Sequence, residues 1–134
     1  MSKMVKISKT FHIRREALKL LYYLKADFMI KNHGNESNFW DEIFQYAYKK
    51  LEEVIVKDKK KIVVARISDK RVATGGYLNK ELYYQLIEMG KKNKLKKYEI
   101  IELAIYFYAL EHLKEDEQKF FNLERWGIIF MQKM

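Results

Sequence analysis

The sequence contains no cysteine, no proline and only three histidines in 134 residues. Without cysteine the chain cannot form disulfides, use a thiolate as a nucleophile, or ligate zinc or an iron–sulfur cluster through sulfur. The histidines, His12, His33 and His112, lie far apart in the sequence. We therefore expect no metal site and no cofactor.

Long apolar runs are also missing. The longest run covers only residues 103–110, well short of the roughly 20 residues that a membrane-spanning helix needs. Residues 1–6 are not followed by the apolar stretch and small-residue cleavage site of a signal peptide. We expect no membrane partner and an intracellular protein, located in the cytoplasm or nucleoid.

Catalytic motifs are absent as well. Glu52, Glu53, Glu99 and Glu102 fall on expected helices, and we interpret them as surface carboxylates without acid–base partners. No glycine-rich phosphate loop and no nucleophile motif occurs. The sequence therefore predicts a binding protein with no catalytic residues, and not an enzyme.

What the chain does have is positive charge, with 27 Lys and Arg against 18 Asp and Glu, a net +9. Residues 57–97 carry 13 basic and 4 acidic side chains, whereas residues 98–134 carry 4 and 7. A small basic domain typically binds phosphate groups or an anionic membrane. The lysine run at 57–61 can equally be a solvated linker.

The N-terminal part predicts a strand followed by two helices. Residues 6–13 alternate polar and apolar side chains, which is typical of a half-buried strand. Helical spacing of apolar residues follows and predicts a helix over about 14–31. It is expected to end at the breaker 32–35, where Gly34 can supply a left-handed cap. Either Ser37 or Asn38 is expected to cap a second helix that fades near 54–57, and Asn38, with Asp41 three residues on, would form an approximate capping box.

The same order then recurs. Residues 71–78 occupy the strand position, and Asn79 is the expected N-cap of a helix with an apolar stripe over 82–89. Residues 90–97 are a lysine-rich connection, and apolar residues from 100 to 108 mark a long second helix. The chain is therefore interpreted as a strand–helix–helix unit written twice.

Both units resemble the ribbon-helix-helix family of transcriptional regulators, the Arc/MetJ/CopG type. Residues 95–105 resemble the family's second helix, with paired aliphatics and an alanine three residues beyond them. Residues 8–13, followed by Ala17, Leu18 and Leu21, resemble its strand-to-helix spacing. The resemblance covers about 6–110. It implies two intertwined units whose strands form an antiparallel ribbon that enters the DNA major groove, while the second helix offers its N-terminus to a phosphate.

We accordingly predict a mainly α fold with a short two-stranded antiparallel β-ribbon. Two ribbon-helix-helix units in one chain form a pseudo-dimer, because a lone unit of about 50 residues buries too little apolar surface. The expected parts are a first unit (1–56), a basic linker with a possible extra strand at 62–67 (57–70), a second unit (71–113) and a C-terminal helical extension (114–134). The linker can span about 40 Å. Pairing between two chains remains the alternative.

Alternation assigns the side chains that would read bases. If Phe11 and Ile13 face the core, then Ser8, Thr10 and His12 face outward, where hydroxyls and an imidazole can contact base edges. On the second strand the outward positions are Ala73, Gly75 and Tyr77, of which Tyr77 is the candidate base contact. The simpler interpretation is that this is the wet face of an amphipathic strand.

Gly75 and Gly76 depart from the pattern, because two glycines weaken a strand and remove side chains. We interpret them as a local irregularity. A tight turn and a close backbone approach to DNA are the alternatives. The resulting asymmetric ribbon predicts a non-palindromic or degenerate recognition site.

Phosphate contacts are expected from the helix starts, where free backbone N–H groups lie at the positive end of the helix dipole. Lysines at a helix start are unfavourable unless an anion compensates them. The predicted phosphate contacts are Lys6, Lys9, Ser37, Asn38, Arg71, Lys94, Lys96 and Lys97.

The function predicted from these features is sequence-specific binding of double-stranded DNA by a transcriptional regulator, most simply a repressor. The apolar tail, 114–134, either folds back on the domain or joins one molecule to the next. An antitoxin whose tail binds a toxin is the alternative function, and a purely structural helical protein is another. Small tandem regulators of this kind resemble those of archaeal viruses, which would place the protein in a host cytoplasm.

Overall fold

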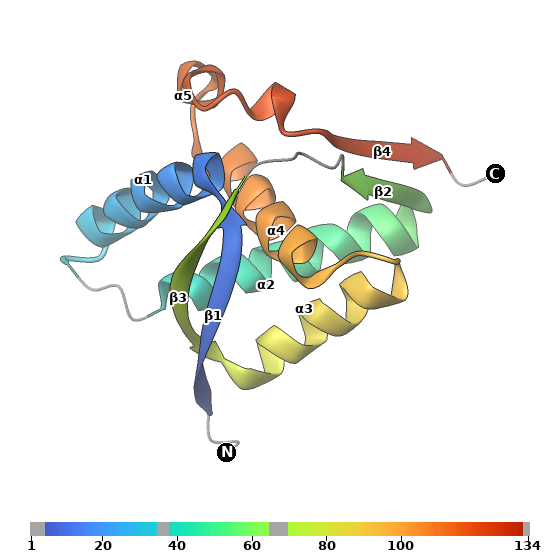
Figure 1. Ribbon diagram of the computed structural model, residues 1–134, viewed down its shortest axis with the longest axis horizontal. Helices are drawn as coiled ribbons and strands as arrows, with labels where there is room; N and C mark the ends of the chain where they lie inside the picture. Colours follow the sequence, from blue (N-terminus) through green and yellow to red (C-terminus); the bar gives the residue numbers. More distant parts are fainter. Residues whose placement is uncertain (1–4, 35–37, 65–69, 133–134) are drawn as a thin grey trace.

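A computed structural model describes residues 5–34, 38–64 and 70–132. The chain is mainly helical, with two separate two-stranded antiparallel sheets (Figure 1). The elements follow in the order β1 (Lys6–Arg14), α1 (Arg15–Lys31), α2 (Phe39–Glu52), a π-helical turn η1 (Glu53–Lys57), β2 (Lys60–Val64), β3 (Arg71–Asn79), α3 (Lys80–Lys92), α4 (Lys97–His112), α5 (Glu115–Phe120), a 3₁₀ turn η2 (Leu123–Arg125) and β4 (Ile128–Gln132). The predicted strand–helix–helix order is therefore present twice.

The first sheet is a ribbon in which β1 pairs with β3 of the same chain, with Thr10 opposite Gly75. Both strands alternate as predicted: Phe11, Ile13 and Leu78 are buried, and the residues between them are exposed or half-buried. The ribbon thus has one face on the core and one face toward solvent.

The two glycines of β3 are not a local irregularity, and they do not form a turn. The strand runs unbroken through both, in register with β1. A Cβ on Gly76 would lie 2.4 Å from Cε2 of Phe11, whereas a Cβ on Gly75 would meet nothing within 4 Å. Gly76 therefore makes room for a buried ring, while Gly75 lies on the exposed face.

Helix α4 is the centre of the molecule and is buried on almost every side. It packs against α1, α2, α3 and β1, and only a helix surrounded in this way can be apolar all round. An aromatic cluster fills the space beneath the ribbon: the ring of Phe11 lies 4.8 Å from Trp40, 6.0 Å from Phe44 and 6.3 Å from Tyr83. This cluster fixes the position of β1 over α2 and α3.

Helix boundaries agree with the sequence at some positions and correct it at others. Asn79 caps α3, accepting a hydrogen bond from Leu82 N–H at 3.1 Å. The predicted capping box at Asn38 is wrong, because the Asn38 side chain makes no cap bond. Residue Gly90 belongs to α3 and not to a connecting segment, and a Cβ there would lie 2.4 Å from Ile100. It therefore allows α3 and α4 to approach closely.

Glu102 does not lie on the surface that its sequence position predicts. It is not a surface carboxylate but a buried one, 2% exposed. Its Oε1 accepts a 2.8 Å bond from Nε of Arg14, the last residue of β1. Arg14 also donates through Nη2 to the carbonyl of Trp126 at 3.2 Å. A central ion pair therefore ties the ribbon to α4 and to the C-terminal segment.

The C-terminal segment folds back on the domain, which is one of the two alternatives expected for it, but it is not wholly helical. Leu123 and Trp126 are buried in the core, and the chain then forms β4, which pairs antiparallel with β2. This pairing explains the β-prone stretch expected at 62–67, of which Val64 is the last residue in β2. Residues 65–69 lie outside the described part of the chain.

None of the helices in the described ranges is long and apolar enough to cross a membrane.

Candidate nucleic-acid interface

The outward face of the ribbon carries the four side chains that the alternating sequence pattern predicts as base contacts. Ser8, Thr10 and His12 are all exposed on β1, and Tyr77 on β3 is 57% exposed. The register sets Ser8 opposite Tyr77, Thr10 opposite Gly75 and His12 opposite Ala73. The predicted orientation of these four side chains is confirmed, and their role in reading bases stays a prediction.

The two strands contribute different side chains to this face. The β1 side carries two hydroxyls and an imidazole, whereas the β3 side offers Ala73 and Gly75 before the large ring of Tyr77. Gly75, opposite Thr10, has open space at its Cβ position among the described residues, and Thr10 itself is exposed. The two strands therefore present different donors and acceptors to any ligand.

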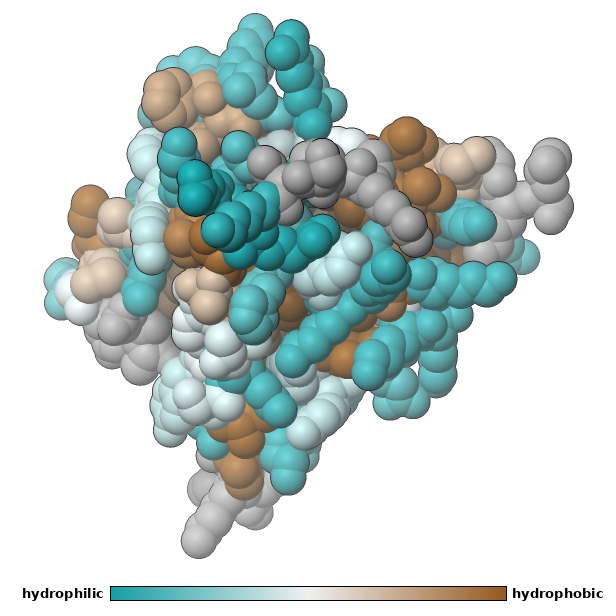
Figure 2. All heavy atoms as spheres, viewed as in Figure 1, coloured by the Kyte–Doolittle hydropathy of each residue, from teal (hydrophilic) through white to brown (hydrophobic). Residues whose placement is uncertain are grey.

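The start of α4 lies beside this face. A hollow of about 190 Å³ is lined by residues of both: Thr10 and His12 from β1, and Lys97 and Tyr98 from α4. Figure 1 shows α4 beginning next to the ribbon, and Figure 2 shows hydrophilic side chains gathered there. The structure thus brings two predicted base contacts and one predicted phosphate contact together.

Positive charge is concentrated at this helix start. The guanidinium of Arg71 stacks 3.6 Å above the ring of Tyr98, and Nζ of Lys96 lies 6.0 Å from the same ring. The Arg71 Nε is buried and has no hydrogen-bond partner within the described ranges. Lys96 and Lys97 are exposed. Cations at the positive end of a helix dipole repel it, so an anion bound here would be stabilised by both.

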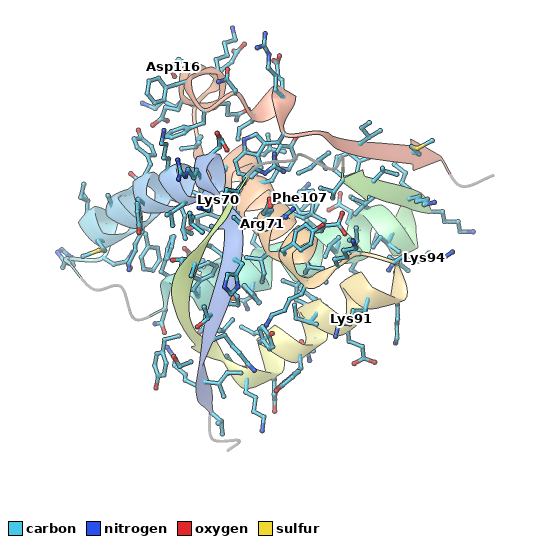
Figure 3. All side chains as sticks on the ribbon, in the orientation of Figure 1. Lys70, Arg71, Lys91, Lys94, Phe107 and Asp116 are labelled. Carbon is cyan, nitrogen blue, oxygen red and sulfur yellow. The ribbon has the colours of Figure 1, made fainter. Side chains whose placement is uncertain are left out.

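One backbone donor predicted to be free at this site is not free. The N–H of Lys96 donates to Oε1 of Glu99 at 2.8 Å, because a carboxylate three residues into a helix can turn back to its start. Lys94 does not reach the ribbon: Figure 3 places it on the connection after α3, well away from β1. The phosphate-binding potential of α4 therefore rests on Arg71, Lys96 and Lys97.

The start of α2 is organised differently. Nζ of Lys6 donates to Oδ1 of Asn38 at 3.0 Å and lies 3.4 Å from a carboxylate oxygen of Asp41. Asp41 also accepts from the backbone N–H of Asn79. Two predicted phosphate contacts, Lys6 and Asn38, thus bind each other beside an acidic group. Ser37 lies outside the described residues.

The remaining predicted contact, Lys9, projects over α3. Its Nζ lies 5.1 Å from the ring centre of Tyr83 and 5.8 Å from that of Tyr84. Nζ of Lys97 lies over Tyr83 as well, at 5.7 Å. Cations are attracted to the face of an aromatic ring within about 6 Å of its centre, so Lys9 and Lys97 both interact with the ring of Tyr83.

Tyr98 is the main residue that sequence reasoning missed. It stacks on Arg71 and lines the hollow with His12. The signal available was its position directly after Lys96 and Lys97 at a predicted helix start. Its contact with Arg71, the first residue of β3, needed the fold, because the two are distant in sequence.

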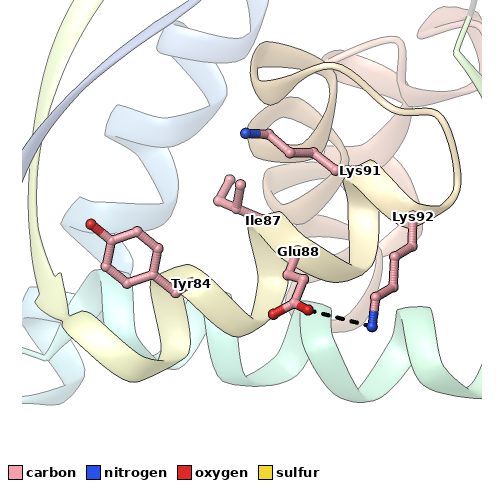
Figure 4. Close-up of a pocket in the computed structure, with 5 residues that line it drawn as sticks. All are labelled: Tyr84, Ile87, Glu88, Lys91 and Lys92. Carbon is pink, nitrogen blue, oxygen red and sulfur yellow. Dashed lines mark ion pairs between the residues drawn. The ribbon is translucent and has the colours of Figure 1, made fainter.

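A second hollow lies on the outer side of α3 (Figure 4) and contains none of the predicted site residues. It is lined by Tyr84, Ile87, Glu88, Lys91 and Lys92, and its one ion pair joins Lys92 to Glu88 at 3.4 Å. Within the part of the chain that the structure describes, no three His, Asp or Glu side chains are grouped so that they could hold a metal ion.

Comparison of the chain with protein-family models, with curated proteins and with solved structures finds no match.

Proposed function

We propose that the protein is a sequence-specific double-stranded DNA-binding transcriptional regulator of the ribbon-helix-helix kind. The β1–β3 ribbon inserts its outward face into the major groove, and basic side chains at the helix starts grip phosphates. The observation that carries the proposal is the shared hollow, in which Thr10 and His12 of the ribbon lie beside Lys97 and Tyr98 of α4. A major groove admits a two-stranded ribbon, and flanking phosphates then lie close to it.

The tandem-unit interpretation has support from the register. Leu21 of α1 and Leu86 of α3 are buried at corresponding positions 65 residues apart. The same offset relates Thr10 to Gly75, and these two residues face each other in the ribbon. A residue paired with its own counterpart lies on a two-fold axis. The two units are therefore proposed to form a pseudo-dimer about this pair.

The proposed DNA site is asymmetric. The ribbon carries polar side chains on β1 and small ones on β3, and the start of α4 is basic, whereas Asp41 neutralises Lys6 at the start of α2. We expect Lys96 and Lys97 to bind the phosphates of their DNA half-site more tightly than the start of α2 binds those of the other half-site. Selection of bound duplexes from a random pool should return a non-palindromic sequence.

Repression is the simplest outcome of such binding, because a ribbon in the major groove blocks other proteins from the same site. The antitoxin alternative requires a C-terminal segment that is free to bind a toxin. Leu123 and Trp126 are buried, and β4 is paired with β2. This packing favours the regulator over the antitoxin.

The test is salt-dependent titration of a labelled duplex from the selected pool, with unlabelled competitor DNA. Replacing both Lys96 and Lys97 with Ala should weaken binding to all sequences and reduce the slope of log K against log salt by about 1–2. Replacing Thr10 and His12 with Ala should instead reduce the preference over competitor, because base contacts carry specificity.

The matched control replaces Lys49 and Lys50, two lysines in the last turn of α2, with Ala. It removes the same charge from a different part of the surface and should leave the salt slope unchanged. An equal change of slope in both double variants would show that only net charge matters, and would refute the assignment of phosphate contacts to α4. Absence of salt-dependent binding to any duplex would favour the structural-protein alternative.

A further inference from the structure

The outer face of the sheet formed by β2 and β4 carries Val63, Ile129 and Met131 together with one charged residue, Lys61. The register pairs Val63 with Ile129 and Lys61 with Met131. Ile129 is 52% exposed and Met131 is 50% exposed. The inner face is partly packed: Ile62 is 3% exposed, and the ring of Phe130, which is itself 37% exposed, stacks on that of Phe107 at 5.9 Å. The outer face and the edges of this sheet are therefore the surfaces left for a partner.

The two edges of the sheet differ in chemistry. Only β2 and β4 belong to it, so each strand has one edge without a strand neighbour in the described chain. Native proteins protect such edges with lysine, proline or bulges. Strand β2 begins with Lys60 and Lys61, whereas β4 has the sequence Ile-Ile-Phe-Met-Gln and contains no charge. Figure 1 shows β4 on the outer side of the sheet, away from the helices.

We propose that the β4 edge pairs with β4 of a second copy of this chain, antiparallel, about a two-fold axis near Phe130. The product is a four-stranded sheet in the order β2, β4, β4, β2. Two-stranded sheets are marginal in water, and additional strands stabilise them. Ile129 and Met131 of both copies then form one apolar face across the joint.

Charge decides which edge is used. The chain carries +9 overall, but residues 98–134, which include β4, carry more acidic than basic groups. Pairing through β4 separates the two β2 strands by three strand spacings, about 14 Å, which exceeds the Debye length of about 8 Å at physiological salt. Pairing through β2 would instead put Lys60 and Lys61 of both copies on adjacent strands, one strand spacing of about 5 Å apart.

The expected dimer is weak and concentration-dependent. Short strands and one small apolar face bury less than the roughly 1,000 Å² of a stable interface. Pairing about a two-fold axis closes on itself, so growth stops at the dimer. Where two copies also bind one DNA molecule, their high local concentration turns a weak contact into cooperative occupation of neighbouring sites.

The first test is sedimentation of the full chain without DNA, from micromolar to millimolar concentration. A monomer–dimer equilibrium is expected. Replacing Ile129 and Met131 with Lys should weaken dimerisation at least about tenfold, equal to 1.4 kcal/mol. Both side chains are half exposed, so the fold should survive, which circular dichroism checks. The control Ile30→Lys, at a 79% exposed position on α1, should dimerise like the parent chain.

The second test uses the absence of cysteine. The single variants Ile129→Cys and Met131→Cys, and their mixture, are oxidised at a concentration at which the parent chain dimerises. Directly opposed residues of paired strands have Cβ atoms about 4.5–5.5 Å apart, close to disulfide reach. If the two-fold axis passes through Ile129 or Met131, the single cysteine variant at that residue forms the disulfide. If the axis passes through Phe130, the mixture of the two variants forms it. A parent chain that stays monomeric, association that continues beyond the dimer, or no cross-link in any of the three samples would overturn the proposal, whether or not the chain binds DNA.

Discussion

The buried ion pair between Arg14 and Glu102 permits a prediction with a worked magnitude. Their side chains are 7% and 3% exposed, and Nε lies 2.8 Å from Oε1. The substitution Glu102→Gln keeps the shape but removes the charge, so the guanidinium stays buried with only neutral acceptors, the Gln amide oxygen and the Trp126 carbonyl. Removing one partner of a buried pair costs about 3–5 kcal/mol, chiefly because the other charge is left uncompensated.

That loss should be large in any unfolding experiment. Unfolding entropy scales at about 2.1 cal/mol/K per residue, which gives about 0.28 kcal/mol/K for this chain. The melting temperature should therefore fall by roughly 10–18 °C. Urea unfolding followed by far-ultraviolet circular dichroism should show a lower midpoint with an unchanged slope, because the same surface is exposed on unfolding.

Two controls separate the effect of burial on stability from the effect of ion pairing. The Asp27–Lys31 pair has nearly the same separation, 2.9 Å, but its side chains are 44% and 63% exposed. Asp27→Asn should cost less than about 1 kcal/mol, since solvent screens exposed pairs. The double variant Arg14→Met with Glu102→Leu removes both charges and should recover most of the stability lost by Glu102→Gln. Equal losses for Asp27→Asn and Glu102→Gln, or a double variant no better than the single, would refute the reasoning.

Three smaller effects follow from the same structure. Gly76→Ala should lower the free energy of unfolding by about 1–3 kcal/mol, because its Cβ would meet the buried ring of Phe11, whereas Gly75→Ala should stay within about 0.5 kcal/mol of the parent in the same urea assay. Asn79→Ala should cost about 1 kcal/mol through loss of the α3 cap, also measured in urea. Burial, and then a hydrogen bond to a glutamate, raise the pKa of Tyr46 to about 12. Because the pKa of Tyr46 in the folded protein exceeds the usual 10, the protonated phenol stabilises the fold fully below pH 10, and this stabilisation is lost as the pH rises to 12. Tyr46→Phe should remove this pH dependence from a series of thermal melts.

The ribbon was predictable because its signal is local. A period of two places Phe11 and Ile13 on one side of β1 whatever their partners are, and the same count from Leu78 assigns the faces of β3. Pairing of the two strands within one chain was the favoured prediction, because a lone strand has unpaired backbone groups, and pairing between two chains was the alternative. What local sequence does not contain is the register, and with it the contact of Gly76 with Phe11.

The errors share a tertiary origin. Glu102 has the spacing of a surface residue, but α4 is enclosed on almost every side, so no face of it reaches solvent at that point. The segment 128–132 has no alternating pattern and was expected to be helical, yet β2 offers it a strand edge. Asn38 is of a residue type common at helix N-caps, but its side-chain oxygen accepts a hydrogen bond from Lys6. In each case a partner distant in the sequence overrides the local preference.

The two ribbon strands end in different ways, and this difference explains how one chain can make an asymmetric surface. Arg14 ends β1 and reaches Glu102 of α4, whereas Asn79 ends β3, caps α3 and donates its N–H to Asp41 of α2. In a homodimer a substitution at such a position would occur in both strands. Here each strand varies alone, so one end can hold a charge and the other a cap. The residues of the outward face can differ between the two strands in the same way: β1 has the hydroxyl of Thr10 where the facing position of β3 has Gly75. If the ribbon reads DNA, the difference between its strands becomes a difference between half-sites, which selection from a random duplex pool measures directly.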